Sequence, residues 1–224
     1  GTTTQTPPYA DLEPRFHATI LYNGSQWKGR TIEPFVGGVD GWCQWNLDRE
    51  PMGRTTTGYY LRKLVDESHD VIAYSGGVQP LIIMRYAEVL LNKAEACYHL
   101  DKTAEANAAV KAVRTRVELP YTDKAGSALW DAIRQERKVE LAFEGLWYWD
   151  LRRWGVAHKQ YPEGLTGYQQ HGLKIEDNGD GTFTYTYVSV DDQDRNFPQK
   201  MYRFPMPSGE LNNNALVEQY PEWK

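Results

Sequence analysis

Hydrophobic positions recur at helical spacing through the middle of the chain. From Leu81 to Leu100 the apolar side chains follow one another at intervals of three and four, which is the period of an amphipathic helix. A second such stretch runs from Ala104 to Val117, and a third begins at Ser127. Because only three residues join the first two stretches, the pattern predicts an antiparallel helical hairpin over about 81–117.

The third helix is predicted to begin with Ser127 as its N-cap residue. Asp131 would then lie in the first turn, where the helix dipole favours a negative charge. Gly145 is predicted to end or bend this helix, because glycine readily adopts the conformation that terminates helices. An amphipathic turn or two then follows up to Trp154, so helices are expected over 127–154.

Alternation of polar and apolar residues occurs in two places. Lys174–Val190 alternates around Asn178–Gly179, a frequent turn dipeptide, and predicts a small β-hairpin near 174–190. Its DNGDG sequence is interpreted as a turn, because the acidic residues do not fall at the alternating ligand positions of a calcium loop. Phe16–Tyr22 is also predicted to form a short strand, ended by Asn23–Gly24.

The segment 11–80 is rich in aromatic residues and glycine, and its apolar residues follow neither the helical spacing nor the alternation of a strand. A stretch this long without regular structure inside a compact protein is usually functional or disordered, and its many aromatic residues argue against disorder. Residues 1–10 are predicted to be a flexible leader. Residues 81–154 are expected to form a helical scaffold, and 155–224 a hairpin and an extended tail. The fold class is therefore mainly α with long irregular loops.

Tryptophans in this aromatic loop region are the candidate binding residues. A sugar ring has one face of C–H groups and an edge of hydroxyls, so a flat aromatic ring can hold the face while polar side chains hold the rim. The predicted carbohydrate-binding residues are Trp42, Trp45, Trp27 and Tyr22, with the first two preferred. The alternative is that each ring fills the irregular core, because Trp is usually buried. The predicted rim residues are Asn23, Gln26, Lys28, Gln44, Asn46, Asp48 and Arg49.

The charged residues of the third helix are interpreted as scaffold. Arg137, Glu140 and Glu144 lie on one helix face at spacings of three and four. Carboxylates one turn apart project side by side, whereas glycoside hydrolysis needs them on opposite sides of a cleft. The pattern predicts a network of ion pairs, with Arg85 as a partner within its own helix or across to Glu140 or Glu144.

Composition indicates a soluble recognition protein. The 224 residues are 41% hydrophobic and 25% charged, as in ordinary globular proteins. A net charge of −5 gives no electrostatic reason to expect binding to nucleic acid or to an anionic membrane. Eight Trp and fifteen Tyr exceed what a core of this size requires, which favours a binding surface.

Catalytic and metal-binding motifs are missing from the sequence. Cys43 and Cys97 are too few for a disulfide scaffold or a metal cluster, and the sequence leaves open whether they pair. The five His residues show no metal-ligand spacing, and no nucleophile or phosphate-binding motif occurs. We therefore expect no cofactor, no metal and no enzyme activity. A glycan-active enzyme with widely spaced carboxylates remains the less favoured alternative.

Three blocks of sequence carry a resemblance to a known family. They are RYAEVLLNKAEA, then ERKVELAFEG with WDLRRWG, and finally YRFPMPSGELNNNALVEQYPEW, in that order between Arg85 and Trp223. Together with DLEPRFHATILYNGSQW (Asp11–Trp27), they resemble the C-terminal part of the SusD/RagB family. Those are cell-surface, usually lipid-anchored nutrient-binding proteins of the Bacteroidetes outer membrane.

The resemblance implies one SusD-like C-terminal region over 1–224, with a tetratricopeptide-like helical hairpin. Family members are about twice this size, so it also implies that the N-terminal helical half of the protein is absent from the chain. An apolar face that this half would cover is then expected to be exposed.

The resemblance further implies non-catalytic binding of oligosaccharide or polysaccharide at the extracellular face of the outer membrane. The ligand would be presented to a SusC-like TonB-dependent transporter, and the lipid anchor would lie on a segment absent from this chain. Some relatives capture peptides, so a peptide-binding scaffold with the loop aromatics as side-chain pockets is the alternative.

Overall fold

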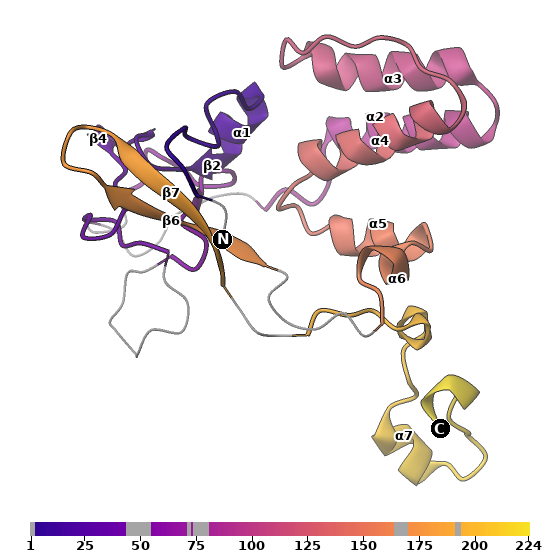
Figure 1. Ribbon diagram of the computed structural model, residues 1–224. Coiled ribbons are helices and arrows are strands. Elements are labelled where there is room, and N and C mark those ends of the chain that lie inside the picture. The colour runs from indigo at the N-terminus through magenta and orange to yellow at the C-terminus, as the bar shows by residue number, and fades with distance from the viewer. Residues whose placement is uncertain (1–2, 44–54, 71–72, 74–80, 164–169, 191–193) are drawn as a thin grey trace. The chain divides into compact units, whose positions relative to one another are not determined.

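The computed structural model describes residues 3–43, 55–70, 73, 81–163, 170–190 and 194–224. The chain divides into two compact units. Unit 1 comprises Gly1–Trp147 and Gln170–Asp191, and unit 2 comprises Tyr148–Gln169 and Asp192–Lys224. Figure 1 shows the helices and strands of both units, each of which is described here by itself.

Three helices form the helical part of unit 1: α2 (Tyr86–His99), α3 (Thr103–Thr115) and α4 (Gly126–Glu140). α2 and α3 lie side by side as a hairpin and α4 packs against α2 (Figure 1). The small side chains at their contact let the helices approach closely. The predicted helical hairpin is confirmed, although α2 begins later than expected. The main buried cluster consists of Ala94, Cys97, Ala106, Ala109, Val110, Leu129 and Ile133.

The start of α4 differs from the prediction. The N-cap residue is Ala125, and its side chain makes no capping hydrogen bond, whereas Ser127 lies inside the helix. Asp131 lies beyond the first turn, which contains no acidic residue. The predictions that Ser127 is the N-cap residue and that Asp131 lies in the first turn were wrong, because a side chain distant in sequence decides where the helix begins. The buried Asn107 of α3 accepts a hydrogen bond from the Lys124 N–H and donates one to the Lys124 carbonyl, both at 2.9 Å.

α4 ends at Glu140, a few residues before the predicted glycine. The chain then turns through Phe143 and Gly145, whose φ angles are 64° and 77°. Gly145 has the left-handed conformation that glycine readily adopts, but it does not end α4, whose C-cap residue is Leu141, so the predicted end of the helix was wrong.

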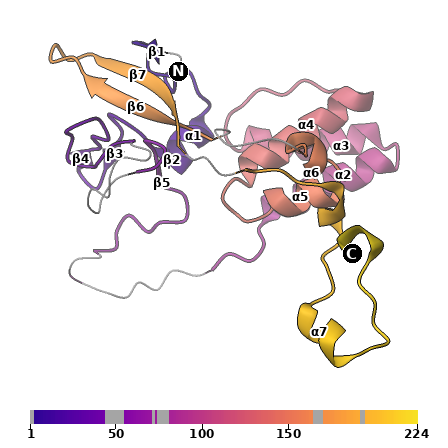
Figure 2. The same cartoon turned by 60° about the horizontal axis from the view of Figure 1, so that its bottom comes forward.

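The second part of unit 1 is built on a β-hairpin. β6 (His171–Asp177) and β7 (Phe183–Ser189) pair antiparallel, with Asp177 opposite Phe183. The strand β1 (Thr3–Thr4) lies along the other edge of β7, so the sheet order is β1-β7-β6 (Figure 2). The hairpin predicted near 174–190 is confirmed. The chain start, predicted to be a flexible leader, contributes a strand here.

The turn of this hairpin uses its acidic side chains for backbone hydrogen bonds. Asp177 accepts from the Gly179 N–H at 2.8 Å, and Asp180 accepts from the Thr182 N–H at 2.9 Å. The turn interpretation of DNGDG is therefore confirmed.

In the described residues of the aromatic loop region there are one short helix and strands of two residues each. The predicted strand over Phe16–Tyr22 was wrong for most of its length, because Pro14 occupies the first turn of a helix, where its fixed φ is favourable. Only the last residues of that segment are extended. The elements are α1 (Pro14–Thr19), β2 (Ile20–Leu21), β3 (Gln26–Trp27), β4 (Arg30–Thr31) and β5 (Tyr60–Leu61).

An aromatic core joins the loop region to the hairpin. Tyr9 is 4% exposed, and its hydroxyl donates to the carbonyl of Asn23 and bonds the hydroxyl of Tyr185, both at 3.2 Å. Burial, reinforced by the hydrogen bond with Tyr185, raises the pKa of Tyr9 well above its ordinary value. The rest of this core consists of Leu173 and Ile175, with Phe16, Tyr22, Phe35, Tyr59 and Phe183 packed against it.

Unit 2 consists of short helical segments: α5 (Trp147–Arg153), α6 (Ala157–Gln160), η1 (Gln199–Tyr202), α7 (Ser208–Asn213) and η2 (Pro221–Trp223). The guanidinium of Arg152 ties α5 to η1, because it donates to the carbonyls of Met201 and Tyr202 at 2.6 and 2.8 Å. Its Cζ also lies 4.4 Å from the ring centroid of Phe204.

Close approach of the hairpin to the loop region gives the first prediction. A Cβ on Gly172 would stand 2.5 Å from Cys43 Sγ and 2.6 Å from Val190 Cγ1. We expect Gly172→Ala to lower the free energy of unfolding by about 1–3 kcal/mol, because the neighbours are buried and must move. Urea denaturation measures this change in the free energy of unfolding. Gly209→Ala is the control, since nothing lies within 4 Å of a Cβ there. Equal stability of the two variants would contradict the close packing.

Candidate functional site

Trp27 lies on a tight hairpin of the loop region. β3 and β4 pair antiparallel, with Trp27 opposite Arg30. The two residues between them, Lys28 and Gly29, have φ angles of 48° and 79°. Positive φ at both positions is the backbone of a type I′ turn, which matches the twist of short hairpins. The indole of Trp27 is half-buried in this arrangement.

Two cations flank the indole of Trp27. The Lys28 Nζ and the Arg62 Cζ lie 6.0 and 5.9 Å from its ring centroid. Lys28 also donates to the carbonyl of His69, and Arg62 pairs with Glu67 at 2.7 Å. The ring is thus held by cation–π contacts from side chains that are themselves fixed. Of these two cations, only Lys28 was predicted from the sequence to lie near the binding residues.

The loop after β4 is fixed by Asp40. Arg30 donates to both of its carboxylate oxygens, at 2.7 and 2.5 Å, and the Glu33 N–H donates to it at 2.8 Å. The hydrogen bond from Arg30, followed by that from the Glu33 N–H, holds the pKa of Asp40 below its ordinary value despite partial burial. The Tyr60 hydroxyl donates to the Asp40 carbonyl, which joins this loop to β5.

Trp42 is half-buried at the end of the same loop. The next residue, Cys43, is 2% exposed and its thiol donates to the carbonyl of Thr56 at 3.1 Å, so it anchors the chain just after the indole. Burial raises the pKa of the Cys43 thiol to about 11, which disfavours the reactive thiolate. Cys43 and Cys97 are both free thiols. Trp45 lies outside the described residues.

Tyr22 belongs to the aromatic core of the loop region. Its ring centroid is 4.4 Å from that of Tyr9 and 5.6 Å from that of Phe16, and its hydroxyl is 2.7 Å from the Nδ1 of His17. The side chain is half-buried. Of the predicted rim residues, Asn23 is buried, whereas Gln26 and Lys28 are exposed. Gln44, Asn46, Asp48 and Arg49 lie outside the described residues.

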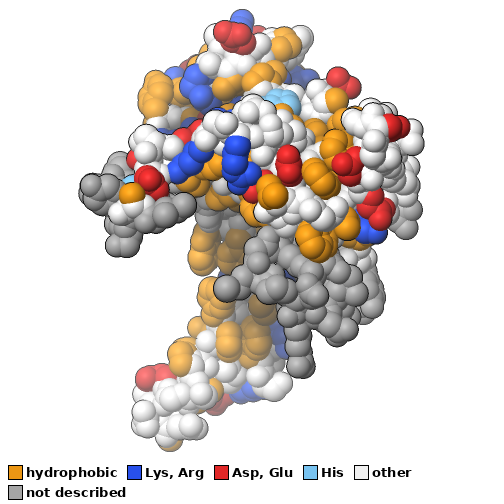
Figure 3. Space-filling model, turned by 90° about the vertical axis from the view of Figure 1, so that its left-hand side faces the viewer, with side chains coloured by type: hydrophobic (Ala, Val, Ile, Leu, Met, Phe, Trp, Pro, Cys, Tyr) orange, Lys and Arg blue, Asp and Glu red, His pale blue; other side chains and the backbone are white. Residues whose placement is uncertain are grey.

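Charged side chains of both signs lie on the described surface of the hairpin and the loop region (Figure 3). Figure 3 shows the side of the molecule that carries the hairpin and the loop region. On the part of this face that the structure describes, hydrophobic side chains are interspersed with Lys and Arg and with Asp and Glu. The described part of this surface therefore combines small apolar areas with charged groups that can form hydrogen bonds (Figure 3).

Arginines and glutamates that are buried or half-buried join α1 to α2, α3 and α4. Arg15 donates from one guanidinium nitrogen to Glu136 at 2.7 Å and to Glu140 at 2.9 Å. Arg85 donates to Glu140 at 2.7 Å and to Glu144 at 2.7 and 2.8 Å. The predicted ion-pair network and the pairing of Arg85 with Glu140 and Glu144 are confirmed. Further donors to these carboxylates are Lys63, Arg114 and Arg116.

The network holds two carboxylates in their charged form. Burial alone would raise the pKa of Glu140, but hydrogen bonds from Arg85 and Arg15 outweigh it, so this pKa lies below its ordinary value. For Glu144 the hydrogen bonds from Arg85 and Lys63 likewise outweigh burial and lower the pKa. Since one guanidinium binds both carboxylates, they lie side by side. The prediction that they share one helix face was wrong, because α4 ends at Glu140 and Glu144 lies in the turn that follows.

A cavity of about 510 Å³ lies next to this network, within unit 1. Its volume is in the range of small-molecule sites. The polar side chains that line it include Arg15, Arg85, Glu140 and Glu144, which are already paired with one another. A ligand in this cavity would have to replace strong ion pairs, so we assign the cavity to the scaffold.

The profile of the SusD family matches residues 1–223. The chain belongs to the SusD family. The curated SusD-like protein P38 of Formosa agariphila is 37% identical over 87 residues, a match that covers 34% of this chain and 17% of that protein. The resemblance of the three sequence blocks to SusD/RagB proteins is thereby confirmed.

Solved structures of SusD-like proteins share the fold. A SusD-like protein from Bacteroides fragilis NCTC 9343 has a TM-score of 0.74 and 29% identity, and the match covers 95% of this chain and 39% of that one. A SusD-like carbohydrate binding protein from the same organism has a TM-score of 0.61 and 23% identity, covering 96% and 43%. The mainly α fold is confirmed, and this SusD-family chain spans about two fifths of the length of these relatives.

Within the described part of this SusD chain, no helix has both the length and the apolarity needed to cross a membrane. The described residues also contain no group of three His, Cys, Asp or Glu side chains arranged to hold a metal ion.

The buried network predicts acid sensitivity. The folded-state pKa values of Glu140 and Glu144 lie below the ordinary value of 4.5. Their contribution to stability is therefore fully present above about pH 4.5 and is lost as pH falls through the lower, folded-state pKa. We expect Glu140→Gln to lower the free energy of unfolding at pH 7 by about 3–5 kcal/mol and to weaken this pH dependence.

Urea denaturation at pH 7 and at several lower pH values measures both effects. Glu105→Gln is the matched control, because its pair with Lys102 is exposed, and we expect a loss below about 1 kcal/mol. If the stability of Glu140→Gln kept the full pH dependence of the parent protein, the ion-pair network would not be the origin of that dependence.

Proposed function

We propose that this SusD-family chain is part of a non-catalytic protein that binds oligosaccharide or polysaccharide at the cell surface. Family membership supports it, and so does the likeness in fold to a solved SusD-like carbohydrate binding protein. The observation that carries it is the position of Trp27 and Trp42, two half-buried indoles on loops that are held by the Arg30–Asp40 pair and by the buried Cys43.

The chemistry of these two loops fits a sugar. A half-buried indole has one part packed on the protein and another part open to a ligand, and the C–H face of a sugar ring can stack on the open part. Exposed Gln26 and Lys28 beside Trp27 can donate hydrogen bonds to hydroxyl groups at the rim. Because the turn of the β3–β4 hairpin and Asp40 fix the loops, little conformational entropy is lost on binding. Trp45 and Tyr22 complete the proposed set.

The carboxylates of the helical scaffold do not support catalysis in this proposal. A glycosidase needs a general acid and a second carboxylate on opposite sides of the scissile bond. Glu140 and Glu144 instead bind the same guanidinium, that of Arg85, and their lowered pKa values disfavour a proton donor.

The proposed setting follows from the family. We propose that the whole protein lies at the extracellular face of the outer membrane, is lipid-anchored through a segment outside this chain, and passes its ligand to a SusC-like TonB-dependent transporter. Modest affinity suffices there, because a nearby transporter sees a high local concentration of ligand.

A glycan array, followed by calorimetry with the best ligand, tests the proposal. We expect binding without turnover. Trp42→Ala combined with Trp45→Ala should weaken it about tenfold or more, and Trp27→Ala should weaken it less, because each change removes a stacking surface. Trp149→Ala is the matched control: this indole is 54% exposed but lies in unit 2, outside the loop region, and its removal should leave affinity unchanged.

Three outcomes would count against the proposal. Unchanged affinity in all loop variants would exclude these indoles from the site. Tighter binding of peptides than of any glycan would favour the peptide-binding alternative. Release of reducing ends over time, abolished by one carboxylate substitution, would establish an enzyme.

A further inference from the structure

Lys28 occupies a backbone position that favours other residues. It is the first of the two residues in the turn between β3 and β4, and its φ angle is 48°. At this position a type I′ turn favours Asn, Asp or Gly, because the left-handed conformation is costly for most other residues. The side chain of Lys28 is exposed, so burial does not offset this cost. A residue held in an unfavourable conformation at a loop tip points to a function of its side chain.

The ammonium of Lys28 is fixed in place without being neutralised. Its Nζ donates a hydrogen bond to the carbonyl of His69, which is an uncharged acceptor. The same atom lies 6.0 Å from the ring centroid of Trp27, at the outer limit of a cation–π contact. The turn therefore presents a positive charge at the edge of the indole.

The other charged side chains around this turn already have partners. The two ion pairs are Arg62 with Glu67 and Arg30 with Asp40. The acidic residues next to His69 in the sequence accept backbone N–H groups at 2.9 and 3.1 Å; these acceptors are Asp66 and Asp70. Among the described residues, Lys28 is thus the cation beside the indole that forms no ion pair with a carboxylate.

We infer that the glycan bound at Trp27 carries an acidic substituent, a carboxylate or a sulfate ester, that pairs with Lys28. This inference rests on the proposed function, because it names the class of glycan that the same indole binds. A sugar stacked on an indole has its substituents at the edge of the ring, where the ammonium lies. A hydrogen bond between two charged groups is about twice as strong as one between neutral groups.

A neutral glycan does not explain the choice of lysine. The amide of an asparagine at position 28 could donate to a sugar hydroxyl equally well, and the turn would favour it. Only an acidic ligand gains from the positive charge. Because the hydrogen bond to His69 already holds the ammonium, this gain is not offset by ordering a long side chain.

Matched acidic and neutral glycans test the inference with the full-length protein. The array contains oligogalacturonates and their methyl esters, and carrageenan oligosaccharides and their desulfated forms, so that carboxylate and sulfate are distinguished. Calorimetry then compares the best ligand with its methyl-esterified or desulfated form. We expect the acidic form to bind at least about tenfold more tightly. Salt should reduce this difference, because it screens exposed charges.

Lys28→Asn separates the charge from the turn. We expect it to weaken binding of the acidic form about tenfold and to leave binding of the neutral form unchanged. Because Asn is favoured in this turn, the variant should also unfold at a higher urea concentration than the parent protein. Weaker binding by a more stable protein cannot result from unfolding. Lys28→Arg keeps the charge and should keep most of the affinity.

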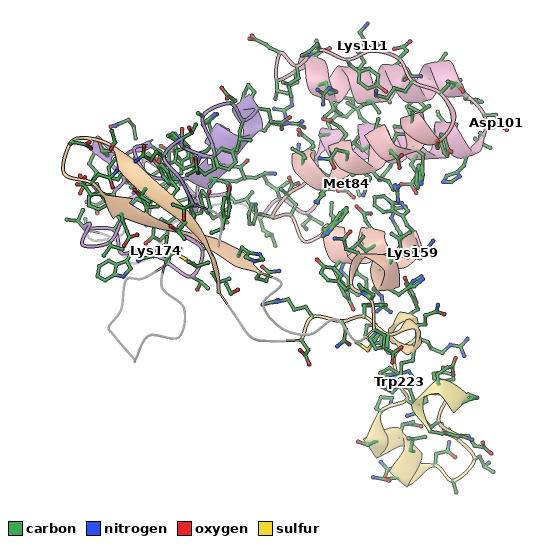
Figure 4. All side chains as sticks on the ribbon, viewed as in Figure 1. Met84, Asp101, Lys111, Lys159, Lys174 and Trp223 are labelled. Carbon is green, nitrogen blue, oxygen red and sulfur yellow. The ribbon has the colours of Figure 1, made fainter. Side chains whose placement is uncertain are left out.

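Lys111→Gln is the matched control. Lys111 is an exposed lysine on α3 (Figure 4), outside the loop region, and its substitution should leave the affinity for both forms unchanged.

Three results would overturn the inference while the proposed function stands. They are equal affinity for the acidic and neutral forms, unchanged affinity of Lys28→Asn for the acidic form, and an equal loss of affinity for both forms in that variant. Binding that Trp27→Ala leaves unchanged would also overturn the inference, because the ligand would then lie elsewhere. If the full-length protein bound no glycan at all, the proposed function and this inference would both be wrong.

Discussion

The fold of unit 1 depends on one buried carboxylate. Glu140, at the end of α4, is 3% exposed and accepts hydrogen bonds from Arg15 of α1, from Arg85 at the N-cap of α2 and from Arg116 at the C-cap of α3. One side chain thus connects four elements that are distant in sequence. Desolvation of these charges costs free energy, so the network contributes a fixed arrangement of its elements more than net stability.

The loop region relies on a different set of constraints. Its described residues form only short strands and one short helix, so their arrangement depends on side chains that bind backbone groups. Asp40 binds the Glu33 N–H, and Cys43 and Tyr60 bind carbonyls. The aromatic core around Tyr9 supplies the hydrophobic contacts. A scaffold of this kind leaves the tips of the loops free to differ between relatives while the anchors keep the rings in place.

Patterns in the sequence predicted the helices and strands that depend mainly on contacts between residues close in sequence. The helical spacing of apolar residues was sufficient to predict α2, α3 and α4, and the alternation of polar and apolar residues was sufficient to predict β6 and β7. Each pattern repeats over several helical turns or residue pairs. The pattern failed where a distant residue decides the structure. Asn107 fixes the entry to α4, and Arg15 enters the buried network from a segment that was predicted to be irregular.

The candidate site, too, was predicted only in part from the sequence. Trp27 and Trp42 were predicted as binding residues from the excess of tryptophan, and both are half-buried. Their binding role stays a prediction. Their surroundings were not predicted, because Arg62 reaches Trp27 from a separate part of the chain and no local spacing relates the two. Asn23 shows the reverse error: it was placed at the rim for its polarity, but the turn at this position buries it.

The pairing of β1 with β7 has a consequence for how the chain is made. Thr3 bonds Thr186, a partner 183 positions later, and Tyr9 packs on Tyr185 of the same strand. A ribosome releases residues in order, so β1 has no strand to pair with until β7 has emerged, whereas Tyr9 can pack on Tyr22 much earlier. The helical hairpin α2–α3 can also form before β7 emerges, because its contacts are local. Synthesis therefore leaves the three-stranded sheet to assemble after the helical hairpin.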